Sequence, residues 1–260
     1  MADLRRILKL DDFEPAAKRH LPRPLYSYVS GGVEDFVTLR ENRAVFQQWG
    51  FVPRVLVGVG NRTQSVELLG KTYAHPFGIG PMGISAMTAY RGDLVLARCA
   101  AEASVPMVMS GSSLIRLEEI AAENPDAWFQ AYLPGDVARI DPLVDRIASA
   151  GYRTLMLTVD TPATPNREHN LRAGFTSPLR PSLRLAWDGI ATPRSAYEFS
   201  KCGMPCRRNV GRNVPKSQRG RAMPSHARRR LGRSGLEKPA RRLCSRFGVA
   251  GVSTVSISVR

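Results

Sequence analysis

Polar side chains follow four short apolar runs in the first 160 residues of the chain. The runs cover residues 77–80, 106–109, 127–131 and 154–159, and their lengths suit buried strands. The residues at or just beyond their ends are Pro81, Met82, Gly83, Ser110, Gln130, Tyr132, Thr158 and Asp160. A single hydroxyl such as Ser110 is most often an ordinary strand-end group. Four such positions in register favour a binding site, because hydroxyl, amide and phenol groups both donate and accept hydrogen bonds.

Three stretches with helical periodicity separate or follow these runs, at residues 92–104, 116–123 and 136–150. This alternation of strand and helix predicts an α/β fold with a parallel sheet and crossover helices. In such a sheet the carboxyl ends of the strands open on one face, where ligands bind. Eight units of this kind need about 200–250 residues to close a barrel, and only four are clear here.

A helical entry segment precedes the first run. Residues 12–48 follow a rough helical rhythm, which Asp11 or Asp12 can cap and which Gly31-Gly32 interrupts. The sequence therefore predicts an N-terminal helical segment in two parts.

Residues 78–83 satisfy the GxGxxG pattern of dinucleotide-binding folds, and Glu102 lies near the distance expected for a ribose-binding acid. Two observations argue against that site. Pro81 has no N–H to donate to a pyrophosphate, and Glu102 falls inside a helical pattern instead of at a strand end. A nicotinamide site is therefore disfavoured.

One segment resembles a known family. Residues 155–162, followed by Asn166-Arg167-Glu168 and Gly174-Phe175, resemble the FMN-dependent α-hydroxy-acid dehydrogenases and oxidases, which include L-lactate and mandelate dehydrogenases and glycolate oxidase. Further matches lie in the same order at residues 26–28, 31–35, 51–56, 81–83 and 129–132. The resemblance runs from about Leu8 to Pro193. It implies a (β/α)8 TIM barrel, present here as its first four or so βα units.

The resemblance also implies a cofactor, FMN, and a substrate, a small 2-hydroxy acid. Backbone groups of one loop would face the isoalloxazine ring, and side chains at three strand ends would bond its polar edge. The FMN-binding residues so implied are Pro81, Met82, Gly83, Ser110, Gln130 and Thr158.

Three residues are implied as substrate contacts. Tyr28 corresponds to a tyrosine that hydrogen-bonds the substrate carboxylate, and Tyr132 to one that orients the substrate near the flavin. Arg167 would offer its guanidinium fork to the carboxylate. The alternatives are a surface salt bridge between Arg167 and Glu168 or another neighbour, and plain core packing for Tyr28.

The catalytic base implied by the family is absent from this sequence. The family oxidises a 2-hydroxy acid to a 2-keto acid, which requires a base, an arginine for the carboxylate and cations near the flavin. Those groups come from a Lys-bearing strand, a His-Gly-Gly-Arg motif and an Asp-Gly-Gly loop in the second half of the barrel. The histidines here lack the required following residues: His20, His75, His169 and His226. We therefore expect a catalytically incomplete enzyme.

The charge changes abruptly at residue 194. Residues 194–260 hold 17 Lys/Arg and 2 acidic residues, a balance of 17 − 2 = +15, against +16 for the whole chain. We therefore divide the chain into a half-barrel, residues 1–193, and an Arg-rich tail, residues 194–260, expected to be disordered. We expect this composition to come from a frameshift or gene-model error in a GC-rich coding region. The alternative is a basic arm that binds nucleic acid or an anionic membrane surface.

Composition also bears on location and association. No run reaches the roughly 18–20 apolar residues of a membrane span, and no signal-peptide core is present. A cytoplasmic location is expected, with peripheral contact at the inner membrane face as an alternative. The absence of CxxC spacing favours free thiols over a zinc site that uses His226, so no metal is expected. A half-barrel exposes strand edges and apolar surface, so self-association is expected.

Overall fold

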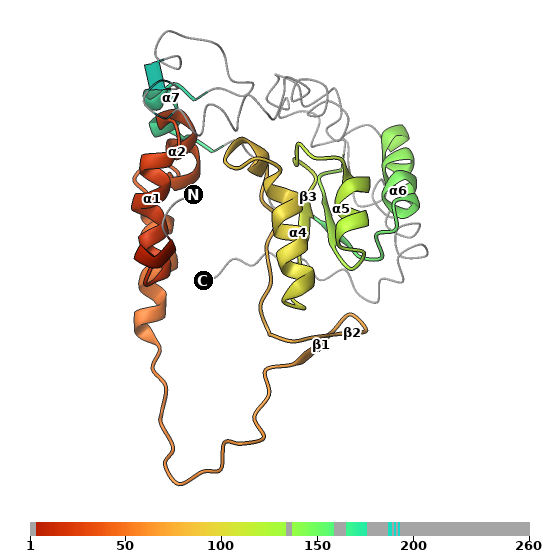
Figure 1. Cartoon of the computed structure of the whole chain (residues 1–260). Coiled ribbons are helices and arrows are strands. Elements are labelled where there is room, and N and C mark those ends of the chain that lie inside the picture. The colour runs from red at the N-terminus through yellow and green to blue at the C-terminus, as the bar shows by residue number, and fades with distance from the viewer. Residues whose placement is uncertain are drawn as a thin grey trace.

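The computed structural model describes residues 4–133, 137–158, 165–175, 187–188, 190 and 192. The division expected after Pro193, the Arg-rich tail and Asp160 lie outside these residues. The described part begins with a group of helices, passes through an extended segment and continues into strand and helix units (Figure 1).

The N-terminal helices confirm the predicted entry segment. They are α1 (Phe13–His20), α2 (Arg23–Ser30) and α3 (Val37–Ala44). Short 3-10 turns flank them at Leu4–Arg6, Leu10–Asp12 and Val45–Gln48. The Asp12 carboxylate accepts hydrogen bonds from the backbone N–H groups of Leu8 (2.9 Å) and Lys9 (3.1 Å), so it closes the turn just before α1. The predicted interruption at Gly31-Gly32 follows directly after the end of α2. We call residues 4–48 the helical arm.

Three parallel strands form the central sheet in the order β3-β4-β5, with bounds Val108–Ser110, Trp128–Ala131 and Leu155–Leu157. Ile79 forms a parallel bridge with Met107, and its N–H donates to the Pro106 carbonyl oxygen at 2.8 Å. The run at 77–80 therefore lies beside β3. All four predicted apolar runs are neighbours and parallel. A separate antiparallel hairpin joins β1 (Val66–Leu68) to β2 (Lys71–Tyr73).

Helices alternate with the strands as predicted. They are α4 (Gly92–Glu102), α5 (Leu117–Glu123) and α6 (Ile140–Ser149), and α7 (Glu168–Ala173) follows β5. Figure 1 shows α4, α5 and α6 following one another beside the sheet. Parallel strands linked by such helices are the first units of a (β/α) barrel. Within the described residues the sheet does not close, which is consistent with the expected partial barrel.

The main core lies between the sheet and these helices. Its largest fully buried apolar side chains are Met107, Met109, Leu117, Ile120, Phe129 and Ile147. The Tyr152 ring meets Phe129 edge-on, with 5.5 Å between centroids, and its hydroxyl donates to the Leu117 carbonyl oxygen at 2.9 Å. A buried phenol needs such a partner. Burial raises the pKa of the Tyr152 phenol, which is therefore neutral.

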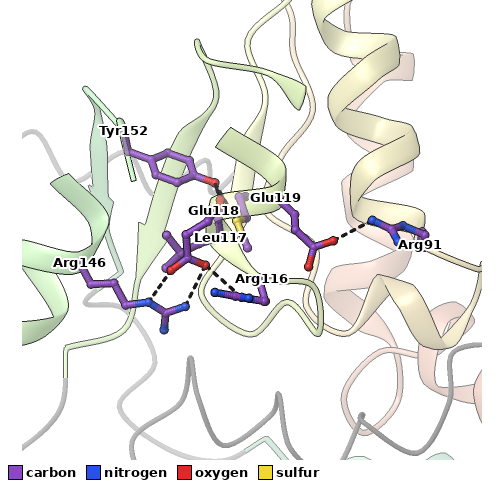
Figure 2. A network of polar contacts seen from close by, with 8 residues as sticks. Arg91, Arg116, Leu117, Glu118, Glu119, Arg146 and Tyr152 are labelled. Carbon is purple, nitrogen blue, oxygen red and sulfur yellow. Dashed lines mark hydrogen bonds and ion pairs between the residues drawn. The ribbon is translucent and has the colours of Figure 1, made fainter. Parts of the chain in front are cut away.

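Ion pairs connect the helices outside this core (Figure 2). Arg146 of α6 donates to both carboxylate oxygens of Glu118 on α5, at 2.9 and 3.0 Å, and Arg116 lies 3.6 Å from the same carboxylate. Arg91, just before α4, pairs with the adjacent Glu119 at 2.7 Å. Glu118 thus links α5 to α6, and Glu119 links α5 to the start of α4. The hydrogen bonds from Arg146 hold the pKa of the Glu118 carboxyl below its usual value.

A second, smaller core attaches the helical arm to the α/β units. Leu21, Leu25 and Phe175 are buried together, and the partly buried Ile84 and Met87 pack against them. Ile84 and Met87 belong to the turn that follows the 77–80 strand. This core therefore places α2 and α7 beside the carboxyl end of that strand.

An extended stretch separates the arm from β1, and Figure 1 shows it looping away from both parts. Its large apolar residues are all more than half exposed: Trp49, Phe51, Val52, Val55, Leu56, Val57 and Val59. We call residues 49–59 the exposed apolar segment. This segment includes residues 51–56, one of the stretches that resemble the family. Its apolar side chains therefore make few contacts with the described residues.

Candidate cofactor and substrate site

A hydrogen-bonded line of side chains crosses the carboxyl edge of the sheet. Gln130 in β4 is buried at the centre of this line, and Ser110 in β3 is the residue paired with Gln130 in the sheet register. Ser110 Oγ donates to Gln130 Oε1 at 3.3 Å, and Gln130 Nε2 donates to Thr158 Oγ1 at 2.7 Å just beyond β5. The Gly111 N–H also donates to Gln130 Oε1, at 3.2 Å. The structure therefore brings together the three strand-end residues that the sequence places in one set.

The loop at residues 81–83 lies next to this line. A Cβ added to Gly83 would stand 3.3 Å from Ser112 Cβ and 3.9 Å from Ser110 Oγ, so the loop backbone passes close to the end of β3. The Ile84 N–H donates to the Ser112 carbonyl oxygen at 3.2 Å. These contacts hold Gly83 and Ile84 beside the end of β3, and Pro81 and Met82 come directly before them in the same loop.

The first glycine of the GxGxxG pattern has a packing explanation. A Cβ at Gly78 would overlap the carbonyl oxygen of Pro106 on the neighbouring strand. The adjacent N–H of Ile79 donates to that same oxygen. Gly78 thus permits close approach of two strands, a role that requires no dinucleotide.

Tyr28 and Arg167 come together away from the sheet edge, between α2 and α7. The Tyr28 ring stacks on Phe175 with 4.5 Å between centroids, and the Arg167 guanidinium carbon lies 5.8 Å from the centre of the Tyr28 ring. Arg167 Nε is buried and has no hydrogen-bond partner among the described residues. The side chain of Glu168 accepts instead from Asn166 Nδ2, at 3.0 Å. Tyr28 thus packs on Phe175, as one alternative expected. Among the described residues, no ion pair between Arg167 and Glu168 is present.

His169, two residues after Arg167, packs α7 against the helical arm. A Cβ at Gly31 would overlap the His169 ring, which lies directly against the glycine backbone, and the ring faces Phe36 at 5.2 Å between centroids. The His169 carbonyl oxygen accepts a hydrogen bond from Ser27 Oγ at 3.2 Å. Sequence reasoning gave this histidine no role. The signal that could have found it is Gly31, whose missing side chain makes room for the ring.

Tyr132 follows β4 directly and is partly buried at the carboxyl edge that carries Gln130. The candidate residues therefore form two groups, one on the sheet edge and one between α2 and α7. Ile84 and Met87 connect them, because these residues follow the 81–83 loop and pack on the core that holds Phe175. In the described part of the chain, no group of three or more His, Cys, Asp or Glu residues could hold a metal ion. Cys99, the one cysteine described, is a free and exposed thiol.

Sequence reasoning also missed Asp93 and Ser113. Both are buried, and Ser113 Oγ donates to Asp93 Oδ2 at 2.7 Å. An acidic residue in the first turn of a helix is usually a solvated partner of the helix dipole, so the pattern at residues 92–93 gave no signal of burial.

Parallel α/β folds, barrels among them, bind their ligands at the carboxyl edge of the strands, and the polar line lies at that edge here. The chain belongs to the FMN-dependent dehydrogenase family, whose model matches residues 17–254. The matched range continues past residue 193, and the division of the chain there stays a prediction.

Individual relatives agree with this membership. The chain is 36% identical over 201 residues to (S)-mandelate dehydrogenase from Pseudomonas putida, covering 76% of this chain and 51% of that protein. It is 37% identical over 184 residues to L-lactate oxidase from a Nostoc species, covering 69% of this chain and 50% of the relative. The chain thus spans about half the length of these relatives.

Solved structures extend the likeness to the fold. A crystal structure described as the monotopic membrane protein (S)-mandelate dehydrogenase superposes with a TM-score of 0.71 at 35% identity, covering 75% of this chain and 52% of the other. The flavin-binding domain of baker's yeast flavocytochrome b2 gives a TM-score of 0.63 at 29% identity, with 69% and 47% covered. These neighbours agree with a partial barrel.

The residues on the sheet edge fit the family's cofactor, FMN. The polar edge of a flavin ring presents both hydrogen-bond donors and acceptors, and an amide flanked by two hydroxyls can answer both. Gly83 keeps the neighbouring backbone free of a side chain. The chemistry of this donor set suits a neutral ring edge better than a phosphate, which would call for cationic groups.

Proposed function

We propose that this chain holds the FMN ring edge and part of the substrate site of a flavoenzyme that oxidises a small 2-hydroxy acid. The observation that supports this most directly is the Ser110–Gln130–Thr158 line at the carboxyl edge of the strands. When bound, FMN supplies the two-electron acceptor of this chemistry. The side chains of this line and the backbone at residues 81–83 would orient the ring.

The α2–α7 pair would bind the substrate. The guanidinium of Arg167 can donate two parallel hydrogen bonds to a carboxylate, and its buried Nε has no partner among the described residues. Tyr28 lies under that guanidinium and can donate its phenol proton to the same carboxylate. Tyr132 at the sheet edge would orient the substrate between this pair and the flavin.

We further propose that the chain does not turn over substrate by itself. The sequence lacks the His-Gly-Gly-Arg, Lys-strand and Asp-Gly-Gly motifs that supply the base and the cations. Without a base, the α-carbon or hydroxyl proton of the substrate has no acceptor at the site. Binding of FMN and oxidation of substrate are therefore separate expectations, and separate measurements test them.

Titration of the purified chain with FMN, followed by quenching of flavin fluorescence, tests the cofactor site. Gln130→Met should weaken FMN binding by at least about tenfold, because Ser110 and Thr158 then lose their shared partner. Gln47→Met, at an exposed position of the arm, is the matched control and should bind as the parent does. Absence of saturable FMN binding by the parent chain would contradict the proposal.

Bleaching of bound flavin under anaerobic conditions tests turnover. Addition of L-lactate or mandelate should leave the yellow colour of the loaded chain unchanged. Rapid bleaching would show that a base is present after all, and the assignment of an incomplete enzyme would be wrong.

A second candidate function rests on the charge of residues 194–260. A balance of +15 in that stretch predicts salt-dependent binding to polyanions without sequence preference. Retention on immobilised DNA that is lost between about 50 and 200 mM salt would support this function. A chain truncated after residue 193 is the control, because it carries about one net positive charge (16 − 15 = +1).

Membrane contact and self-association are further parts of the proposal. One solved relative is described as a monotopic membrane protein, and no helix among the described residues is long and apolar enough to cross a membrane. Peripheral contact would be seen as co-sedimentation with anionic vesicles. The exposed apolar segment would drive self-association, and a monodisperse monomer in sedimentation velocity would argue against it.

A further inference from the structure

Asp93 is a buried carboxyl group outside the residues assigned to cofactor or substrate. It lies in the first turn of α4, and only 2% of the residue is exposed. Its Oδ2 accepts a hydrogen bond of 2.7 Å from Ser113 Oγ, and Ser113 is 1% exposed. Burying a carboxyl is costly unless it is hydrogen-bonded, so the pair is expected to stabilise a specific local arrangement.

Ser113 ends the loop that begins at the polar line of the sheet edge. The Ser113 N–H donates to the Ser110 carbonyl oxygen at 3.0 Å, and the Ser112 N–H donates to Ser110 Oγ at 3.1 Å. On the far side, the Ile115 N–H donates to Ser113 Oγ at 3.1 Å. By holding the Ser113 hydroxyl, Asp93 therefore holds the loop that runs from Ser110 to Ser113.

The start of α4 is also tied to the turn that follows residues 81–83. A Cβ at Gly92 would stand 3.2 Å from the Ser85 carbonyl oxygen, so helix and turn are in close contact. The Ser85 hydroxyl is buried beside them, close to the Asp93 carboxyl. One residue earlier, the Ile84 N–H donates to the Ser112 carbonyl oxygen. Helix start, turn and loop thus meet at one place.

We propose that Asp93 is a positioning residue that, through Ser113, holds the 81–84 and 110–113 loops together and so shapes the FMN edge of the site. It touches neither cofactor nor substrate in this role. The reference to FMN rests on the function proposed above, whereas the fixing of the loops does not. Burial raises the pKa of the Asp93 carboxyl and the Ser113 hydroxyl opposes that rise, in keeping with a hydrogen bond in a closed environment.

Hydrogen–deuterium exchange of the intact chain, read by mass spectrometry, tests the fixing of the loops. In Asp93→Ala and Ser113→Ala, peptides over residues 81–88 and 110–116 should exchange about tenfold faster, the effect of one lost buried hydrogen bond to a carboxylate. Peptides over α6 should keep their rates. The double variant should exchange no faster than Asp93→Ala, because the two residues act as one unit.

Two further variants separate positioning from general destabilisation. Asp93→Asn keeps an acceptor for the Ser113 hydroxyl and should restore most of the protection. Glu102→Gln changes an exposed carboxyl on the same helix and should leave exchange unchanged. Unchanged loop exchange in Asp93→Ala, or an equal rise over α6, would overturn the proposal.

FMN titration of the same variants separates this proposal from the proposed function. If the parent binds FMN, Asp93→Ala should weaken binding about tenfold, whereas Glu102→Gln should not. If the parent binds no FMN but the loops of Asp93→Ala exchange faster, the proposed function fails while the fixing of the loops stands. If the parent binds FMN and Asp93→Ala binds it equally well, the role of Asp93 at the FMN edge is wrong.

Discussion

The α/β units and the helical arm differ in how much of their structure is buried. Helices α4, α5 and α6 each bury two or more residues against the sheet, and the main core contains several side chains with no exposed surface. In the arm, α1 and α3 bury no residue, and α2 buries only Pro24 and Leu25. Buried apolar area is the main source of stability. The α/β units should therefore be stabilised by their own core, whereas the arm depends on a few buried contacts with the rest of the chain.

The two parts of the proposed site, one for the cofactor and one for the substrate carboxylate, fall on opposite sides of this difference. The polar line for the cofactor lies on the well-packed sheet, whereas Tyr28 lies on the arm and Arg167 on the short segment that meets it. Cofactor binding should therefore survive changes that release the arm, and substrate binding should not.

The largest effect is expected in the main core. Ile147 on α6 is fully buried, and Ile147→Ala should lower the free energy of unfolding by about 2–5 kcal/mol. Phe51→Ala, in the exposed apolar segment, removes a larger side chain that touches little and should change stability by less than about 0.5 kcal/mol. Urea unfolding measures both. A loss in Phe51→Ala comparable with that in Ile147→Ala would show that the segment is packed in solution.

Gly31→Ala should release the arm without unfolding the sheet. The new methyl group would overlap the His169 ring, and such overpacking costs about 1–3 kcal/mol. Gly50→Ala is the matched control, because a Cβ there would have no neighbour within 4 Å. Hydrogen exchange should rise over α2 and α7 and stay constant over α4 to α6. A uniform rise across both regions would remove the distinction between arm and sheet.

Tyr152→Phe should have an effect of similar size on the sheet side. It removes the hydrogen bond to the Leu117 carbonyl oxygen and leaves that buried acceptor without the phenol, which costs about 1–3 kcal/mol. The ring contact with Phe129 remains. Tyr90→Phe, at an exposed phenol, should be neutral, and thermal unfolding of both variants measures the difference.

The sequence predicted the sheet side of the molecule well for a physical reason. Strands and helices there repeat with clear apolar periods, and parallel strands must align their carboxyl ends, so Ser110, Gln130 and Thr158 could be placed together before any contact was known. The family resemblance then supplied chemical roles for these positions, which periodicity alone could not.

Contacts between distant segments were harder to predict. The contact of His169 with Gly31 and the pairing of Asp93 with Ser113 join residues that no local period relates. Gly31 could be interpreted as a helix break, which it is, but its role as a space for a ring depends on α7 packing beside α2. Asp93 has the sequence features of a solvated helix start, and only the 110–113 loop above it explains its burial.

The smallest predicted effect lies on the surface that joins the helices, and it depends on pH. The hydrogen bonds from Arg146 lower the pKa of Glu118 in the folded chain, so folding favours the ionised carboxylate. The stabilisation is present above the unfolded pKa of about 4.3 and is lost as pH falls through the lowered folded pKa. Because both side chains are partly exposed, Glu118→Gln should cost only about 0.5–1 kcal/mol at pH 7.

In urea unfolding the difference from the parent chain should shrink below pH 4, whereas Glu102→Gln should show no such trend. A difference that persists at low pH would mean that Glu118 stabilises α5 and α6 through packing of its side chain. The ion pair would then contribute nothing to the stability of the α/β units relative to the helical arm.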